Sequence, residues 1–138
     1  MSNKCYRSSM GAKTGGARLE ERWREILAVH ARTLGEIDRA LHPYGLVASD
    51  FEVLDLLATA TPRDGEQCRV QNLVGRVHLS QSALSRLIAR LEKDGLVERS
   101  MCLEDRRGVY VGLTRKGREL HSEVLPLQRA VLARTLDA

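Results

Sequence analysis

Residues 80–118 constrain the fold most strongly, because an amphipathic helical pattern there runs directly into the alternating pattern of a β-hairpin. Ser80 is a favourable helix N-cap, and Asp94-Gly95 is a favourable C-terminus because glycine adopts the left-handed conformation easily. Residues 96–99 and 109–113 have the composition of two antiparallel strands. The segment therefore predicts a helix at 80–94 and a β wing whose tip spans 100–108.

The net charge of the chain lies in this same segment. It contains nine Lys and Arg against five Asp and Glu, whereas the whole chain has 22 against 18 and a formal charge of +4. The other residues carry equal numbers of basic and acidic side chains. Charge concentrated in one segment is typical of a surface that contacts a phosphate polymer.

On a helical wheel, residues 80–94 divide into two faces. The apolar face contains Ala83, Leu84, Leu87, Ile88 and Leu91, and the opposite face contains Ser82, Ser85, Arg86, Ala89 and Lys93. Small side chains let a backbone approach closely, which favours a helix in the major groove of DNA. We expect DNA contacts from Ser80, Gln81, Ser82, Ser85, Arg86, Arg90 and Lys93. The alternative is an ordinary amphipathic helix with an incidental polar face.

The predicted wing carries two further arginines. Arg106 and Arg107 lie at its tip, where a guanidinium group can enter the minor groove. Asp105 beside them would repel phosphate unless it is paired, so we expect it to orient Arg107 or an arginine of the preceding helix. The alternative is that Asp105 to Gly108 form a polar turn and nothing more.

The rest of the chain is predicted to be mainly helical. We expect a flexible basic tail at 1–17, a helix at 18–45, a helix-turn-helix lobe at 46–114 and a last helix at 115–138. Within the lobe, Ser49–Glu52 has the form of a capping box. Thr114 is expected to cap the last helix, and Pro126 is expected to kink it. The apolar positions of the first helix step by four and three, at Leu19, Trp23, Ile26, His30, Leu34, Ile37 and Leu41, which favours packing against a second subunit as well as the lobe.

Several classes of function are disfavoured by the composition. The three cysteines are far apart, so we expect no disulfide framework, metal site or other cofactor, although Cys102 is a candidate redox sensor. The sequence contains no HExxH motif or Gly-rich phosphate loop, so we expect no enzyme. No run of residues has the length and apolar character of a membrane helix, and no signal peptide is recognisable, so we expect a cytoplasmic protein without a membrane partner.

The helix and hairpin resemble the winged helix-turn-helix of the MarR (multiple antibiotic resistance regulator) family of bacterial transcription regulators. The matching marks are residues 79–82, residues 91–97, Asp105-Arg106-Arg107, and Leu113-Thr114 followed by Gly117. The resemblance implies a mainly α fold with a small β wing, in which long N- and C-terminal dimerisation helices flank the DNA-binding lobe. Family members normally continue with one more helix, so the C-terminal dimerisation helix is expected to be truncated.

The resemblance also implies a homodimer on a pseudo-palindromic operator in double-stranded DNA. It implies a small aromatic or phenolic effector that lodges between the dimerisation helices and the lobe, where Trp23 and His30 are candidate ligand-binding residues. We therefore predict a sequence-specific DNA-binding regulator, a repressor relieved by a small ligand or by oxidation. The alternative is a winged-helix module that binds another protein and has no specific DNA binding.

Overall fold

The long first helix, α2 (Gly15–Leu41), runs along one side of the molecule. The structure is a computed structural model that describes residues 15–101 and 108–136. Helix α2 begins three residues before the expected position 18, and so includes Gly15 and Gly16 in spite of the low helix propensity of glycine. It ends at Leu41, before the expected 45, and the 3-10 turn η1 (His42–Tyr44) follows, closed by Gly45 at a φ of 74°.

Helix α3 (Ala48–Ala60) starts two residues earlier than the Ser49–Glu52 capping box predicted, since that box would make Ser49 the N-cap. Its N-cap is Val47, and the backbone N–H of Val47 donates to the Asp50 carboxylate at 2.9 Å. The capping-box prediction was therefore wrong in its residues. Asp50 lies three positions after the N-cap, which lets its short side chain reach back to the N-cap amide.

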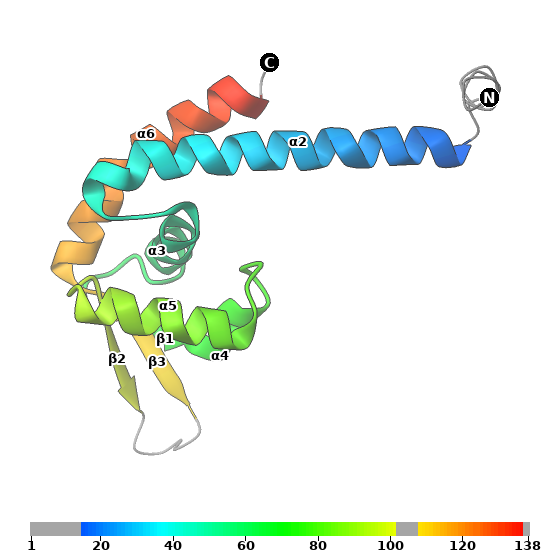
Figure 1. Ribbon diagram of the computed structural model, residues 1–138. Helices are drawn as coiled ribbons and strands as arrows, with labels where there is room; N and C mark the ends of the chain where they lie inside the picture. The colour runs from blue at the N-terminus through cyan, green and yellow to red at the C-terminus, as the bar shows by residue number, and fades with distance from the viewer. Residues whose placement is uncertain (1–14, 102–107, 137–138) are drawn as a thin grey trace, which may run out of the picture.

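The lobe continues with β1 (Cys68–Arg69), α4 (Val70–Val74), α5 (Gln81–Lys93), β2 (Val97–Met101) and β3 (Val109–Leu113). The three strands form an antiparallel sheet in the order β1-β3-β2, in which Cys68 pairs with Val111 and Val97 pairs with Leu113. Figure 1 shows the β2–β3 hairpin projecting from the lobe beside α5. The expected fold class, mainly α with a small β wing, is confirmed.

Apolar side chains from every layer of the lobe meet in one core. Its fully buried large members are Phe51, Val53, Leu54, Leu57, Leu73, Leu84, Ile88, Leu91, Val97 and Val111, together with Leu41 of α2 and Val124 of the last helix. The apolar face predicted for residues 80–94 supplies three of them. The core thus joins α5 and the sheet to both terminal helices and fixes how the exposed face of α5 is presented.

The last helix, α6 (Arg115–Leu136), begins where the sequence predicted. The Thr114 hydroxyl accepts a hydrogen bond from the backbone N–H of Gly117 at 3.0 Å, which confirms the cap. A Cβ on Gly117 would lie 1.9 Å from the carbonyl oxygen of Leu96, so the junction with the hairpin requires glycine. The helix continues through Pro126, and Figure 1 shows that it changes direction as it passes behind α2.

Polar contacts fasten α6 to its neighbours. His121 is buried, stacks on Phe51 with ring centroids 5.6 Å apart, and its Nε2 lies 2.8 Å from Oδ1 of Asp55 on α3. Near its C-terminal end, Arg134 forms a 3.1 Å ion pair with Glu36 of α2. Helix α6 therefore bridges the lobe and the C-terminal half of α2.

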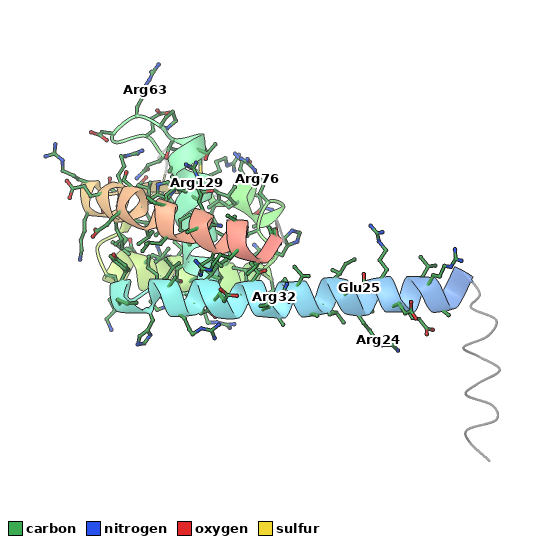
Figure 2. All side chains as sticks on the ribbon, turned by 90° about the horizontal axis from the view of Figure 1, so that it is seen from above. Arg24, Glu25, Arg32, Arg63, Arg76 and Arg129 are labelled. Carbon is green, nitrogen blue, oxygen red and sulfur yellow. The ribbon has the colours of Figure 1, made fainter. Side chains whose placement is uncertain are left out.

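The N-terminal half of α2 extends away from the rest of the molecule, as Figure 2 shows. Its apolar side chains are exposed, including Leu19, Trp23, Ile26 and Leu27. None of the helices in the described part of the chain is long and apolar enough to cross a membrane.

Candidate nucleic-acid interface

The start of α5 is set by Ser80. Its hydroxyl oxygen accepts a hydrogen bond from the backbone N–H of Ala83 at 3.1 Å, and it lies 3.3 Å from the Ser82 hydroxyl. The predicted N-cap is therefore confirmed. Because the cap defines the first turn, Gln81 and Ser82 are exposed at the free end of the helix.

The two faces of α5 separate as the wheel predicted. Leu84, Leu87, Ile88 and Leu91 are buried, whereas the predicted DNA-binding residues Ser80, Gln81, Ser82, Ser85, Arg86, Arg90 and Lys93 are all exposed. Ala89 is exposed among them. Within residues 15–101 and 108–136, neither Arg86 nor Lys93 has an ion-pair partner, so both cationic groups are available to an external anion.

Arg90 differs from the other exposed basic residues of α5. Its guanidinium group makes a bidentate ion pair with Asp50, whose side chain is completely buried, and Nη1 lies 3.1 Å from Oδ2. The hydrogen bonds from Arg90 to Asp50 raise the pKa of the guanidinium group. Two of its nitrogens, Nη1 and Nη2, are therefore bonded to a buried carboxylate that requires a partner, while the side chain remains 46% exposed. The contact of Arg90 with DNA stays a prediction.

A second ion pair connects α5 to the base of the wing. Arg99 of β2 donates from Nε to Glu92 at 3.0 Å, and its Nη2 lies 2.8 Å from the same oxygen. These hydrogen bonds lower the pKa of the Glu92 carboxyl. This pair was not predicted from the sequence, although the opposite charges on either side of the Gly95 turn were a usable signal.

The tip of the wing lies outside the described residues. Cys102, Asp105, Arg106 and Arg107 belong to it, so their predicted roles in redox sensing, orientation and minor-groove contact stay predictions. The two strands at its base are regular, with Met101 paired to Val109. The base of the wing is thus positioned against α5 by the sheet register and by the Glu92–Arg99 pair.

A cavity of about 630 Å³ lies between α2 and the lobe. Its apolar wall is formed by Leu34, Ile37, Val47, Ala48, Val77 and Leu79, and its polar wall by His30, Asp38, Ser49, Glu52, Arg76 and His78. Burial raises the pKa of the Glu52 carboxyl, nearby Asp55 raises it further, and His78 lowers it. The mixed wall suits a small molecule with an apolar body and a polar group.

The two candidate ligand-binding residues have different positions. His30 lines this cavity, whereas Trp23 is 58% exposed on the projecting part of α2 and is not among the cavity residues. Glu52 of α3 and the pair Arg76 and His78, in the turn between α4 and α5, were not predicted because these two segments are separated in the sequence and meet only in the folded chain. Within residues 15–101 and 108–136, no three His, Cys, Asp or Glu side chains are grouped as metal ligands would be.

Comparison with known proteins places these features in context. Residues 48–109 match the model of the MarR family. The crystal structure of AbsC, a MarR family transcriptional regulator from Streptomyces coelicolor, is 31% identical, with a TM-score of 0.75 over 90% of this chain and 80% of that one. The uncharacterised HTH-type transcriptional regulator YkoM of Bacillus subtilis is 29% identical over 85% of this chain and 75% of its own length.

A structure of a MarR mutant from E. coli complexed with operator DNA has the same fold. It is 22% identical to this chain, with a TM-score of 0.74, and the match covers 89% of this chain and 85% of that one. The structural match extends beyond the lobe to most of both terminal helices, because a match that covers 89% of this chain leaves few of the described residues unmatched.

Proposed function

The chain belongs to the MarR family of DNA-binding transcriptional regulators, and we propose that it represses transcription as a homodimer on a pseudo-palindromic operator. The observation that carries this proposal is the exposed face of α5, where small side chains stand beside Arg86 and Lys93, neither of which has an ion-pair partner among the described residues. Such a face lets the helix approach base edges while cationic groups meet phosphates.

In this proposal α5 occupies the major groove. Gln81, Ser82, Ser85 and Arg86 read base edges, with arginine suited to guanine and glutamine to adenine. Ser80 and Lys93, at the two ends of the helix, contact the phosphate backbone. The major groove is about 12 Å wide, which suits a helix whose groove-facing residues are small.

The wing enters the adjacent minor groove. Arg106 and Arg107 supply the guanidinium groups, and Asp105 holds one of the arginines in place. The Glu92–Arg99 ion pair supports this role, because it ties the wing base to α5 and so fixes the spacing between the two groove contacts. The operator-bound E. coli relative also supports duplex DNA as the partner.

The dimer forms through the projecting half of α2. Leu19, Trp23 and Ile26 lie on one helical stripe there and are at least half exposed. An exposed apolar stripe of this kind favours a partner that covers it. A second copy of the chain brings two α5 helices to two half-sites, which matches the symmetry of a palindromic operator.

A small effector relieves repression by occupying the cavity between α2 and the lobe. The cavity lies between α2, which is proposed to set the dimer geometry, and the lobe that carries α5. A ligand that binds better to one relative position of α2 and the lobe increases the population of molecules in that position. His30 and Arg76 offer polar contacts to an aromatic or phenolic compound. Relief through oxidation at Cys102 is a separate proposal for the same regulator.

Selection of bound duplexes from random DNA, followed by affinity measurements on operator and scrambled sequences, tests the function. We expect operator affinity to fall steeply with salt, and Arg86→Ala to weaken operator binding by about 1 to 3 kcal/mol. Arg129→Ala removes the same charge from the exposed surface of α6 and is the matched control. Equal affinity for operator and scrambled DNA would contradict sequence-specific recognition, and failure to bind any duplex would favour a protein-interaction module.

A further inference from the structure

Asp50 is a completely buried carboxylate at the N-terminus of α3 with both oxygens engaged. Oδ2 accepts hydrogen bonds from the backbone N–H of Val47 at 2.9 Å and from Nη1 of Arg90 at 3.1 Å, and Oδ1 accepts from Nη2 of the same arginine. One side chain therefore caps α3 and holds α5. A bidentate arginine–carboxylate pair is planar and directional, so it restricts rotation and sliding of α5.

The adjacent backbone amide makes the next link. The N–H of Ala48 donates to Oδ1 of Asp38, on α2, at 2.8 Å. Two successive amides, those of Val47 and Ala48, are thus held by carboxylates from different helices. The result is a continuous chain of charge-assisted hydrogen bonds from α2, through the N-terminus of α3, to α5.

We propose that Asp50 and Asp38 are positioning residues for operator recognition, and that Arg90 serves DNA binding through Asp50 and not by contacting phosphate. The inference rests on the proposed function and adds to it. The other contacts of α5 with the lobe come mainly from leucine and isoleucine side chains, which pack without strong directionality. Glu92 makes a directional contact with the wing through Arg99, and the Asp38–Asp50–Arg90 relay supplies the directional contacts on the side of α3 and α2. The relay connects the helix that reads bases to the helix that joins the two subunits.

The negative charge of Asp50 allows a positioning role to be distinguished from a general electrostatic effect on DNA binding. Asp50→Asn removes a negative charge, so its effect on attraction to DNA phosphates is favourable or neutral. The same change removes the charged bidentate partner of Arg90. A positioning role therefore predicts that Asp50→Asn weakens binding to the operator while binding to scrambled DNA stays equal or becomes tighter.

The experiment measures dissociation constants for operator and scrambled duplexes over a range of salt concentrations. For Asp50→Asn we expect the operator preference to fall by about tenfold, the loss of roughly one charge-assisted hydrogen bond, with no change in the salt slope. For Asp38→Ala we expect a fall of about threefold. Asp38→Asn keeps an oxygen acceptor for the Ala48 amide and is expected to restore the preference.

The Asp38 variants keep the test decisive if Asp50→Asn fails to fold, because the Asp38 side chain is exposed. A wild-type protein without operator preference would refute the proposed function itself. If the wild type prefers the operator over scrambled DNA, and Asp50→Asn and Asp38→Ala both show the same preference as the wild type, the relay is refuted. If the Asp50 and Asp38 variants lose the same affinity for operator and for scrambled DNA, the two residues have a merely structural role. If Arg90→Ala lowers the slope of log affinity against log salt by about one, Arg90 contacts a phosphate directly.

Discussion

The two halves of α2 have the same apolar period and opposite surroundings. In the N-terminal half, Leu19, Trp23 and Ile26 are 69%, 58% and 50% exposed, whereas Ile37 and Leu41 in the C-terminal half are 5% and 0% exposed. The C-terminal half packs on the lobe and α6, and the N-terminal half projects beyond both (Figure 2). The same sequence pattern thus forms one surface that is buried within the chain and one that is exposed.

This difference shows that apolar periodicity identifies a helix face but not what covers it. Ile37 and Leu41 contribute to the stability of the folded chain itself, because their burial accompanies folding. Trp23 and its neighbours contribute only when a second surface meets them. Substitutions in the two halves are therefore expected to change different quantities.

The largest effect is expected in the buried half. Leu41→Ala leaves a cavity beneath α2 and should lower the free energy of unfolding by about 2 to 5 kcal/mol, measured by urea denaturation. Leu19→Ala makes the same chemical change in the exposed half and is the control, expected to alter monomer stability by less than about 0.5 kcal/mol. Equal losses in the two variants would show that the halves do not differ as described.

The next effect is on self-association. Trp23→Ala should raise the dimer dissociation constant by about thirtyfold, the loss of about 2 kcal/mol typical of a central interface tryptophan, measured by sedimentation or light scattering. Arg24, which is labelled in Figure 2, follows Trp23 in the sequence and lies on another face of the helix. Arg24→Ala is therefore the control and should leave association nearly unchanged. A Trp23→Ala protein that dimerises as tightly as the wild type would place the dimer interface elsewhere.

Local signals in the sequence predicted much of the lobe. Ser80, Gly95 and Thr114 determine helix ends through contacts within a few residues, and each was predicted correctly. The capping box of α3 failed because two acidic residues, Asp50 and Glu52, compete within one turn, and the geometry of the chain selected Asp50. Such a choice depends on where the preceding loop enters the helix.

Contacts between residues far apart in the sequence could not be predicted for a different reason. Arg90 and Asp50 are 40 residues apart, and His121 and Asp55 are 66 apart. Arg90 has the exposed helical position expected of a DNA contact, so spacing alone does not distinguish the two roles. The feature that sets Arg90 apart is its bidentate pair with the buried Asp50, and burial of a single aspartate is a product of the whole packing arrangement.

A smaller effect is expected where α6 fastens the buried half of α2. Arg134 is 59% exposed and Glu36 is 25% exposed, so solvent screens their ion pair. Arg134→Gln should lower the free energy of unfolding by about 0.5 kcal/mol, and the difference should shrink as salt is added. A loss above about 2 kcal/mol would mean that this contact, and not core packing, holds the C-terminal half of α2 in place.

The smallest expected change in the free energy of unfolding involves Glu52, in the cavity beside the middle of α2. His30, Leu34 and Ile37 of α2 line this cavity, at the point where the exposed half of the helix meets the buried half. Burial raises the pKa of the Glu52 carboxyl there, Asp55 raises it further, and His78 lowers it. The folded state therefore favours the protonated form, and the wild type loses stability as the pH rises through the raised pKa.

Glu52→Gln removes this titration. It should raise the free energy of unfolding at pH 7 by less than about 0.5 kcal/mol, and the gain should vanish below the carboxyl's ordinary pKa, where both proteins are uncharged at this position. Urea denaturation at several pH values between about 4 and 8 measures the difference. If the difference in the free energy of unfolding between Glu52→Gln and the wild type grows toward acid pH, the fold favours the Glu52 carboxylate and this cavity is well hydrated.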